Sequence, residues 1–141
     1  MSNYQDKKNN LDEENELQLI IGRNPVIEAL KAGKHIYAMA APATEGQFGV
    51  DITMASWKKA MKEMGFTDFY DVGLGGDMTA AYEAEEWAEA YKEGNKKVTS
   101  CCPAFVNMVR LHYPELAECV STTVSPMCAV SRLIKAKDPE A

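Results

Sequence analysis

The chain has 141 residues, of which 46% are apolar, and 15 Lys and Arg against 21 Asp and Glu give it a formal net charge of −6. This length allows one domain with a hydrophobic core, and the acidic balance disfavours nonspecific binding to nucleic acid or to an anionic membrane surface. Because no apolar run approaches the roughly 20 residues that cross a bilayer, and because the first 16 residues lack the apolar core of a signal peptide, we expect a cytoplasmic protein with no membrane contact.

Two segments open the chain before the pattern becomes regular. Residues 1–16 are polar, charged and nearly free of apolar side chains, which predicts a disordered tail. Residues 17–34 predict a short strand-turn-helix segment, with an apolar run at 17–21, turn residues at 22–25 and a helix at 26–31 that Gly33 ends. We expect the main domain to begin after this segment.

From His35 onward, short apolar runs alternate with helical patterns. The predicted strands are residues 35–40, 69–72, 97–99 and 120–124. The predicted helices are residues 53–64, 78–93, 104–112 and 126–137. Gly73-Leu-Gly-Gly76 is expected to be a flexible turn, with Asp77 as the N-cap of the helix that follows. This alternation predicts an α/β fold with a parallel sheet of about four strands flanked by helices.

Adjacent cysteines stand where the third predicted strand meets a helix. Pro103 suits the first turn of a helix, so Cys101 and Cys102 precede a helix start, where free N–H groups favour negative charge. Thiolate is the form of cysteine that binds metal. In an intracellular chain, the four cysteines are more typical of metal ligands, catalytic groups or small buried residues than of disulfides. A metal or catalytic role and a buried packing role both remain open on these grounds.

Two glutamates of the long predicted helix share one face. Glu83 and Glu86 are three residues apart, and carboxylates so placed can relay protons if that face is buried. The alternative is a solvated acidic face, since three further glutamates follow on the same helix: Glu85, Glu89 and Glu93.

Five sequence blocks occur in a specific order. They are Tyr37-Ala-Met-Ala-Ala-Pro-Ala43 with Gly46-Gln-Phe-Gly49, Gly75-Gly-Asp-Met-Thr79, Thr99-Ser-Cys-Cys-Pro-Ala-Phe-Val106, Tyr113-Pro-Glu-Leu116 and Val120-Ser-Thr-Thr-Val-Ser-Pro-Met127. With these blocks, residues 35–141 resemble the first lobe of the two-lobed catalytic domain of iron–iron (FeFe) hydrogenases, especially the sensory-type branch. That family reversibly reduces protons to dihydrogen at a six-iron H-cluster, a 4Fe-4S cubane joined by a shared cysteine to a diiron subcluster.

The resemblance implies a role for each matching residue. Cys102 matches a thiolate ligand of the cubane, and Cys101 matches the thiol that passes protons to the diiron subcluster. Glu83, Ser121 and Glu86 match the proton relay that leads from that thiol to the surface. The residues that match the lining of the diiron pocket are Ala41, Pro42, Ser125 and Pro126.

Two blocks of that family are missing from the sequence. The family holds the cubane with four cysteines, and the later ones lie in a Met-Pro-Cys-x-x-Lys block and a Cys-x-x-x-Cys block, neither of which occurs here. We therefore expect a truncated first lobe that is inactive alone, because one cysteine does not hold a four-iron cluster. Its expected partners are the missing second lobe or a second copy of itself, and a redox protein such as a ferredoxin in the full protein.

Two other functions compete with this interpretation. One is a noncatalytic iron-sulfur redox or interaction module that keeps the fold. The other rests on residues 20–33, which resemble the opening of the RNA-binding domain of knotted-fold RNA 2′-O-methyltransferases and would place RNA contacts at Arg23 and Asn24. The net charge of −6 weighs against nucleic acid.

Overall fold

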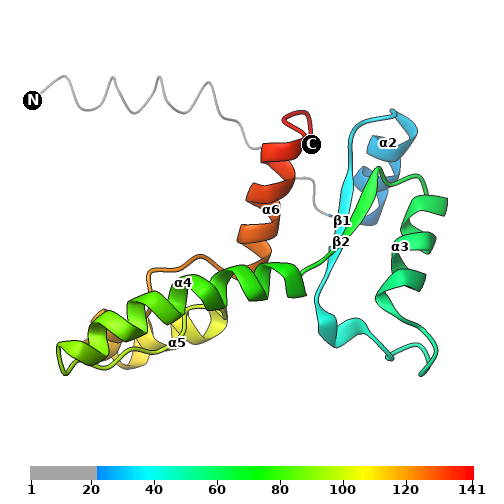
Figure 1. Ribbon diagram of the computed structural model, residues 1–141. Helices are drawn as coiled ribbons and strands as arrows, with labels where there is room; N and C mark the ends of the chain where they lie inside the picture. The colour runs from blue at the N-terminus through cyan, green and yellow to red at the C-terminus, as the bar shows by residue number, and fades with distance from the viewer. Residues whose placement is uncertain (1–21) are drawn as a thin grey trace, which may run out of the picture. The chain divides into compact units, whose positions relative to one another are not determined.

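The computed structural model describes residues 22–141 (Figure 1). The chain divides into two units, with the boundary between Gly33 and Lys34. In the first unit, helix α2 (Arg23–Lys31) starts three residues before the predicted helix and buries Ala29. The predicted tail and the apolar run at 17–21 lie outside the described residues.

A two-stranded parallel sheet begins the second unit. Strand β1 (Tyr37–Ala40) pairs with β2 (Asp68–Asp71), with Tyr37 opposite Asp68 and Ala40 opposite Asp71. The pairing extends past β2, where the Val72 N–H donates to the Ala40 carbonyl at 2.9 Å. The chain crosses between the strands through a 3-10 helix, η1 (Pro42–Thr44), and helix α3 (Met54–Glu63). This arrangement confirms a mixed α/β fold with parallel pairing.

Helix α3 is fixed at its start by a cap and along its length by charge. The Thr53 hydroxyl accepts from the Ser56 N–H at 3.4 Å, which satisfies one free donor of the first turn. Farther along, the ammonium groups of Lys58 and Lys62 lie 3.0 and 3.3 Å from an Asp68 carboxylate oxygen. Because Asp68 begins β2, these pairs hold α3 against the sheet.

The prediction of about four strands is wrong for the second half of the sheet. Residues 97–99 and 120–124 meet in a single parallel bridge, between Val98 and Val120, instead of forming strands. The Ser100 and Thr122 N–H groups donate to glutamate carboxylates of the long helix, at 2.9 and 3.1 Å. Backbone donors bound to side chains in this way are not free to extend a ladder.

Helix α4 (Gly73–Lys92) begins earlier than predicted, so the expected flexible turn at 73–76 and the Asp77 N-cap are both wrong. The Asp71 carboxylate accepts the Gly73 N–H at 2.7 Å and thereby satisfies a donor of the first helical turn. Asp77 lies inside the helix and is exposed. Among the glycines of this turn, Gly75 has a packing role. A Cβ added there would lie 2.8 Å from Val130 Cγ2 and closer still to the Pro126 carbonyl oxygen.

The remaining helices follow the predicted bounds closely. They are α5 (Pro103–His112) and α6 (Pro126–Lys137). Between them lies a 3-10 helix that was not predicted, η2 (Pro114–Cys119). In Figure 1, α6 rises from the first turns of α4, and α5 runs beside the far half of α4. The buried apolar side chains of this unit are Phe69, Val72, Ala90, Val109, Ala129, Val130 and Ile134. This core is small and centres on the contact of α4 with α6.

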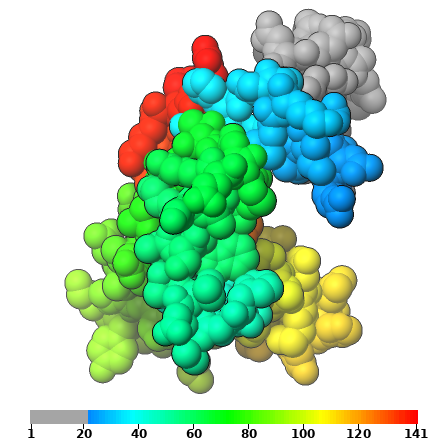
Figure 2. Space-filling model, turned by 90° about the vertical axis from the view of Figure 1, so that its right-hand side faces the viewer, coloured from blue at the N-terminus to red at the C-terminus, as the bar shows by residue number. Residues whose placement is uncertain are grey.

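Many large apolar side chains of the described residues are exposed. Phe48 and Val50 expose 74% and 93% of their surface, in the loop between η1 and α3 that lies at the lower front of Figure 2. Helix α4 adds Tyr82, Trp87 and Tyr91. None of the helices within residues 22–141 combines the length and apolar character needed to pass through a membrane.

Candidate functional site

The paired cysteines occupy the predicted position before a helix. Cys102 is the N-cap residue of α5, Pro103 is its first residue, and both cysteine side chains are exposed. The backbone N–H of Cys101 donates to the Thr99 hydroxyl at 3.2 Å, which ties the turn to the preceding segment. The interpretation of these cysteines as small buried residues is therefore wrong.

Glu83 of α4 holds the segment directly before the cysteines. Its carboxylate accepts the Thr99 hydroxyl at 2.9 Å, the Ser100 N–H at 2.9 Å and the Ser100 hydroxyl at 3.3 Å. The same Thr99 hydroxyl accepts from Cys101 N–H, so a single side chain lies between Glu83 and the cysteine backbone. Long-range hydrogen bonds of this kind bring the helix and the cysteine turn together.

Glu86 holds the neighbouring segment. The Thr122 N–H donates to its carboxylate at 3.1 Å, and the Thr122 hydroxyl bonds to the same group. Hydrogen bonding from the Ser121 hydroxyl, followed by that from Thr122, lowers the pKa of Glu86 below its usual value, against the opposing effect of burial; Lys97 adds to the lowering. Glu86 is thus an ionised carboxylate beside buried Ser121.

The Glu83 and Glu86 contacts are joined by a short polar path. The Ser100 hydroxyl lies between the Glu83 carboxylate and the Thr123 carbonyl, and the Thr123 N–H donates to the Ser121 hydroxyl at 3.1 Å. The structure therefore brings Cys101, Glu83, Ser121 and Glu86 into one neighbourhood, with Thr99, Ser100 and Thr123 between them.

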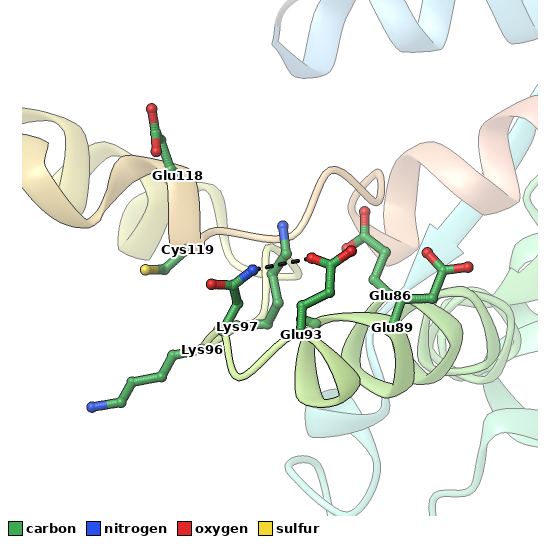
Figure 3. Close-up of a pocket in the computed structure, with 9 residues that line it drawn as sticks. Glu86, Glu89, Glu93, Lys96, Lys97, Glu118 and Cys119 are labelled. Atoms are coloured by element: carbon green, nitrogen blue, oxygen red, sulfur yellow. Dashed lines mark hydrogen bonds between the residues drawn. The ribbon is translucent and has the colours of Figure 1, made fainter.

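A pocket of about 440 Å³ opens beside Glu86 (Figure 3). Glu89 of α4 and Glu93, the C-cap residue of that helix, line it, together with Glu118 and Cys119 from the end of η2. In Figure 3, Lys96 and Glu118 extend away from the three helix glutamates. The acidic face is therefore divided: Glu83 and Glu86 turn to the protein, while Glu85, Glu89 and Glu93 are exposed.

The four residues expected to line a diiron pocket lie in two turns that contact the start of α4. Pro42 lies close to Gly73, because an added Cβ there would be 3.2 Å from Pro42 Cγ, and Ala41 precedes it as the N-cap of η1. The Ser125 hydroxyl caps α6 by accepting the Cys128 N–H at 3.3 Å, and Pro126 contacts Gly75. The first turn of α4 thus brings these two proline turns together.

A groove of about 620 Å³ joins the cysteine turn to the start of α6. Ser100 and Pro103 line one end, Ser121 lies along it, and Ser125 and Cys128 line the other end. Of the predicted site residues, the structure brings Ser121 and Ser125 to this groove, beside the cysteine turn.

The contacts of Glu86 predict a pH dependence. Because its folded-state pKa is lowered, the group stabilises the fold above about pH 4.5, its ordinary value, and this contribution is lost as the pH falls through the lower folded pKa. We expect urea unfolding below pH 4.5 to show a steeper loss of stability for the natural chain than for Glu86→Gln. Glu89→Gln, at an exposed position on the same helix, is the control and should follow the natural chain.

Sequence reasoning missed the hydroxyl residues that bind the two glutamates. Thr99, Ser100 and Thr122 make these contacts, each one or two positions from a predicted site residue. A run of hydroxyl side chains at the ends of two neighbouring predicted strands was the available signal. Their partners could not be assigned because they lie 16 to 36 residues away along the chain.

Comparison with characterised proteins gives similar hydrogenases. The chain is 32% identical over 103 residues to iron hydrogenase 1 of Clostridium pasteurianum, covering 66% of this chain and 18% of that protein. It is 31% identical over 114 residues to the periplasmic [Fe] hydrogenase large subunit of Nitratidesulfovibrio vulgaris, covering 72% of this chain and 27% of that protein. The chain therefore spans about a fifth to a quarter of the length of these relatives.

A solved structure supports the same fold. It comes from work on the oxygen inactivation of an [FeFe]-hydrogenase through its H cluster 2Fe subcluster, and it matches with a TM-score of 0.63 and 23% identity. The match covers 79% of this chain and 33% of that one. The family described as "Iron only hydrogenase large subunit, C-terminal domain" matches residues 34–141, which leaves the RNA-methyltransferase resemblance of residues 20–33 as a prediction. Over residues 34–141, the chain belongs to the iron-only hydrogenase large subunit family.

Proposed function

We propose that this chain supplies the first-lobe part of an H-cluster domain, with one cluster ligand and a proton path. The observation that carries this proposal is the attachment of Glu83 to Thr99 and Ser100, immediately before Cys101 and Cys102. Two α4 carboxylates are thereby linked through hydroxyl groups to a turn that exposes adjacent thiols.

The described residues do not fit a complete four-iron cubane. Such a cluster is normally held by four cysteine thiolates. Within residues 22–141, no three His, Cys, Asp or Glu side chains gather in a metal-binding arrangement. We therefore assign one ligand to this chain, Cys102, and infer that the other thiolates come from a different stretch of protein.

The proton path that we propose uses residues of this chain alone. Glu86 faces the acidic pocket and exchanges protons with solvent there. The Ser121 hydroxyl lies beside Glu86, and the Ser100 and Thr99 hydroxyls bond to the Glu83 carboxylate next to the cysteine turn. Since Ser121 and Ser100 meet only at the Thr123 backbone, the path requires a water molecule between their hydroxyl groups. Cys101 is the terminal group of this path.

We propose the sensory-type branch, a cytoplasmic location and a ferredoxin-like electron donor for the assembled protein. The branch and the electron donor rest on the resemblance of residues 35–141 to the FeFe hydrogenase family.

Anaerobic reconstitution with iron and sulfide tests the ligand assignment. We expect the chain alone to form no stable four-iron cluster, and expect cluster absorption when it is mixed with the complementary region of the Clostridium pasteurianum relative, which would provide the remaining thiolates. Cys102→Ala should abolish that absorption, whereas Cys119→Ala should preserve it. Absorption in the mixture that is independent of Cys102 would contradict the proposal.

The same experiment addresses the noncatalytic alternative. If the chain alone forms a cluster that depends on Cys101 and Cys102, then a self-contained iron-sulfur module explains the cysteines better than a shared site does. Absorption that appears only in the mixture supports the shared site.

A further inference from the structure

A second apolar stripe runs along α4, away from the face that packs on the rest of the unit. The buried face of α4 includes Gly75, Thr79 and Ala90. The other stripe is exposed except at half-buried Glu83. It lines a shallow groove at Ala80, Glu83, Ala84, Trp87, Ala88 and Tyr91. These positions recur at three- and four-residue intervals, as on a helix that packs against another helix.

The stripe contains large side chains that the described unit covers only in part. Trp87 exposes 50% and Tyr91 exposes 84% of its surface. Both lie toward the C-terminal end of the stripe, whereas Ala80 and Ala84 lie toward its N-terminal end. One half of the stripe is therefore bulky and the other half is small.

This asymmetry matches a second copy of the same helix in antiparallel orientation. A two-fold axis through the middle of α4 places Ala80 opposite the second copy's Tyr91 and Ala84 opposite the second copy's Trp87. Each aromatic side chain then packs against an alanine, in an isologous interface that closes on itself. Glu83 does not become an unpaired charge there, because Thr99 and Ser100 already satisfy its carboxylate.

Charges beside the stripe are complementary under the same axis. Asp77 lies near the start of α4 and Lys92 is its last residue, and both are exposed on the same flank. Neither takes part in an ion pair among residues 22–141. At a rise of about 1.5 Å per residue, the antiparallel arrangement brings Lys92 level with the second copy's Asp77 to within about 3 Å along the axis.

We propose that the Ala80–Tyr91 stripe of α4 is a homodimer interface, in which two copies pair antiparallel. The four aromatic side chains would bury on the order of 600 Å², to which the alanine methyl groups add. A total below about 1,200 Å² is typical of weak, transient association. The dimer is therefore expected to be reversible and concentration-dependent.

Sedimentation equilibrium over a wide concentration range tests the proposal on the full chain. We expect a monomer-dimer equilibrium, and Trp87→Ala with Tyr91→Ala should weaken it by about tenfold or more. Tyr82→Ala removes an aromatic side chain that is 64% exposed on α4 but outside the stripe, and it should leave the equilibrium unchanged. Circular dichroism checks that each variant keeps its helices.

A charge exchange tests the orientation. Lys92→Glu should weaken the dimer, and Lys92→Glu combined with Asp77→Lys should restore it, with an effect that decreases at high salt. A monomer at all concentrations would overturn the proposal. Association that the stripe variants leave unchanged would also overturn it, as would a charge exchange that does not restore the dimer. None of these results depends on cluster binding, so the proposal fails or stands independently of the proposed function.

Discussion

Replacing Gly75 by alanine is expected to destabilise the chain by about 3 kcal/mol or more, as overpacking of a close backbone contact does. The added Cβ would lie 2.8 Å from both the Pro126 carbonyl carbon and Val130 Cγ2, and it would approach the Pro126 carbonyl oxygen even more closely. Val130 is fully buried, so it has no space into which to move. The contact of α4 with α6 must therefore open.

Gly76→Ala is the matched control. The neighbouring glycine is in the same helical turn, and a Cβ there would meet nothing within 4 Å. Because alanine has a higher helix propensity, this variant should be more stable by up to about 1 kcal/mol. Urea unfolding followed by circular dichroism measures both changes.

A double variant identifies the cause. Gly75→Ala combined with Val130→Ala removes the side-chain clash but leaves the clash with the backbone carbonyl of Pro126. We therefore expect no recovery of stability from the second substitution. Similar stability of Gly75→Ala and the natural chain would show that α6 does not pack as closely on α4 as described.

The start of α4 shows where sequence reasoning was misled. Three glycines at 73, 75 and 76 predicted a flexible turn, because glycine is usual there. The structure instead uses Gly75 to admit the Pro126 carbonyl and the Asp71 carboxylate to satisfy the first turn. The partner of Gly75 lies far away along the chain, so local propensity could not reveal that contact. Asp71 is only two residues before Gly73, and the prediction missed this local signal.

The cysteine turn shows the opposite case. Pro103 at the first position of a helix is a local signal, and α5 begins at that residue. The spacing of Glu83 and Glu86 likewise predicted a shared face, and both side chains turn toward the protein. At these two places the local pattern was sufficient, because the feature that it predicted lies within one helical turn.

The second half of the predicted sheet does not form, because backbone donors there bond to glutamate side chains of the candidate site. Residues 97–99 and 120–124 have strand composition, yet Ser100 and Thr122 give their N–H groups to glutamates. The pattern of apolar residues could not show this competition. The interaction that ends the sheet is the same one that connects α4 to the cysteine turn.

The largest expected effect on activity is at Glu83. In an assembled H-cluster domain that contains this chain, Glu83→Gln should lower the rate of hydrogen evolution by roughly 10²–10⁴-fold, the range that general acid–base groups contribute. Glutamine keeps an oxygen that accepts the Ser100 N–H, but it does not exchange a proton at neutral pH. Position and hydrogen bonding are largely preserved while proton transfer is lost.

Two variants separate proton transfer from structure. Glu85→Gln changes an exposed glutamate of the same helix and should leave the rate unchanged. Ser121→Ala removes a hydroxyl beside Glu86 and should lower the rate, because the path from the acidic pocket then lacks one of its exchanging groups. Iron content and cluster absorption should remain equal in all three variants.

The pH profile gives the decisive readout. If Glu83 relays protons, the residual rate of Glu83→Gln should depend more strongly on pH or on added small buffer acids, which donate protons by a slower route. If Glu83 only fixes the Thr99 and Ser100 segment, its loss should instead reduce cluster content, and buffer should have no effect. Because Glu83 bonds to the backbone directly before Cys101, both results are measurable on the same samples, and only the first is consistent with the proposed proton path.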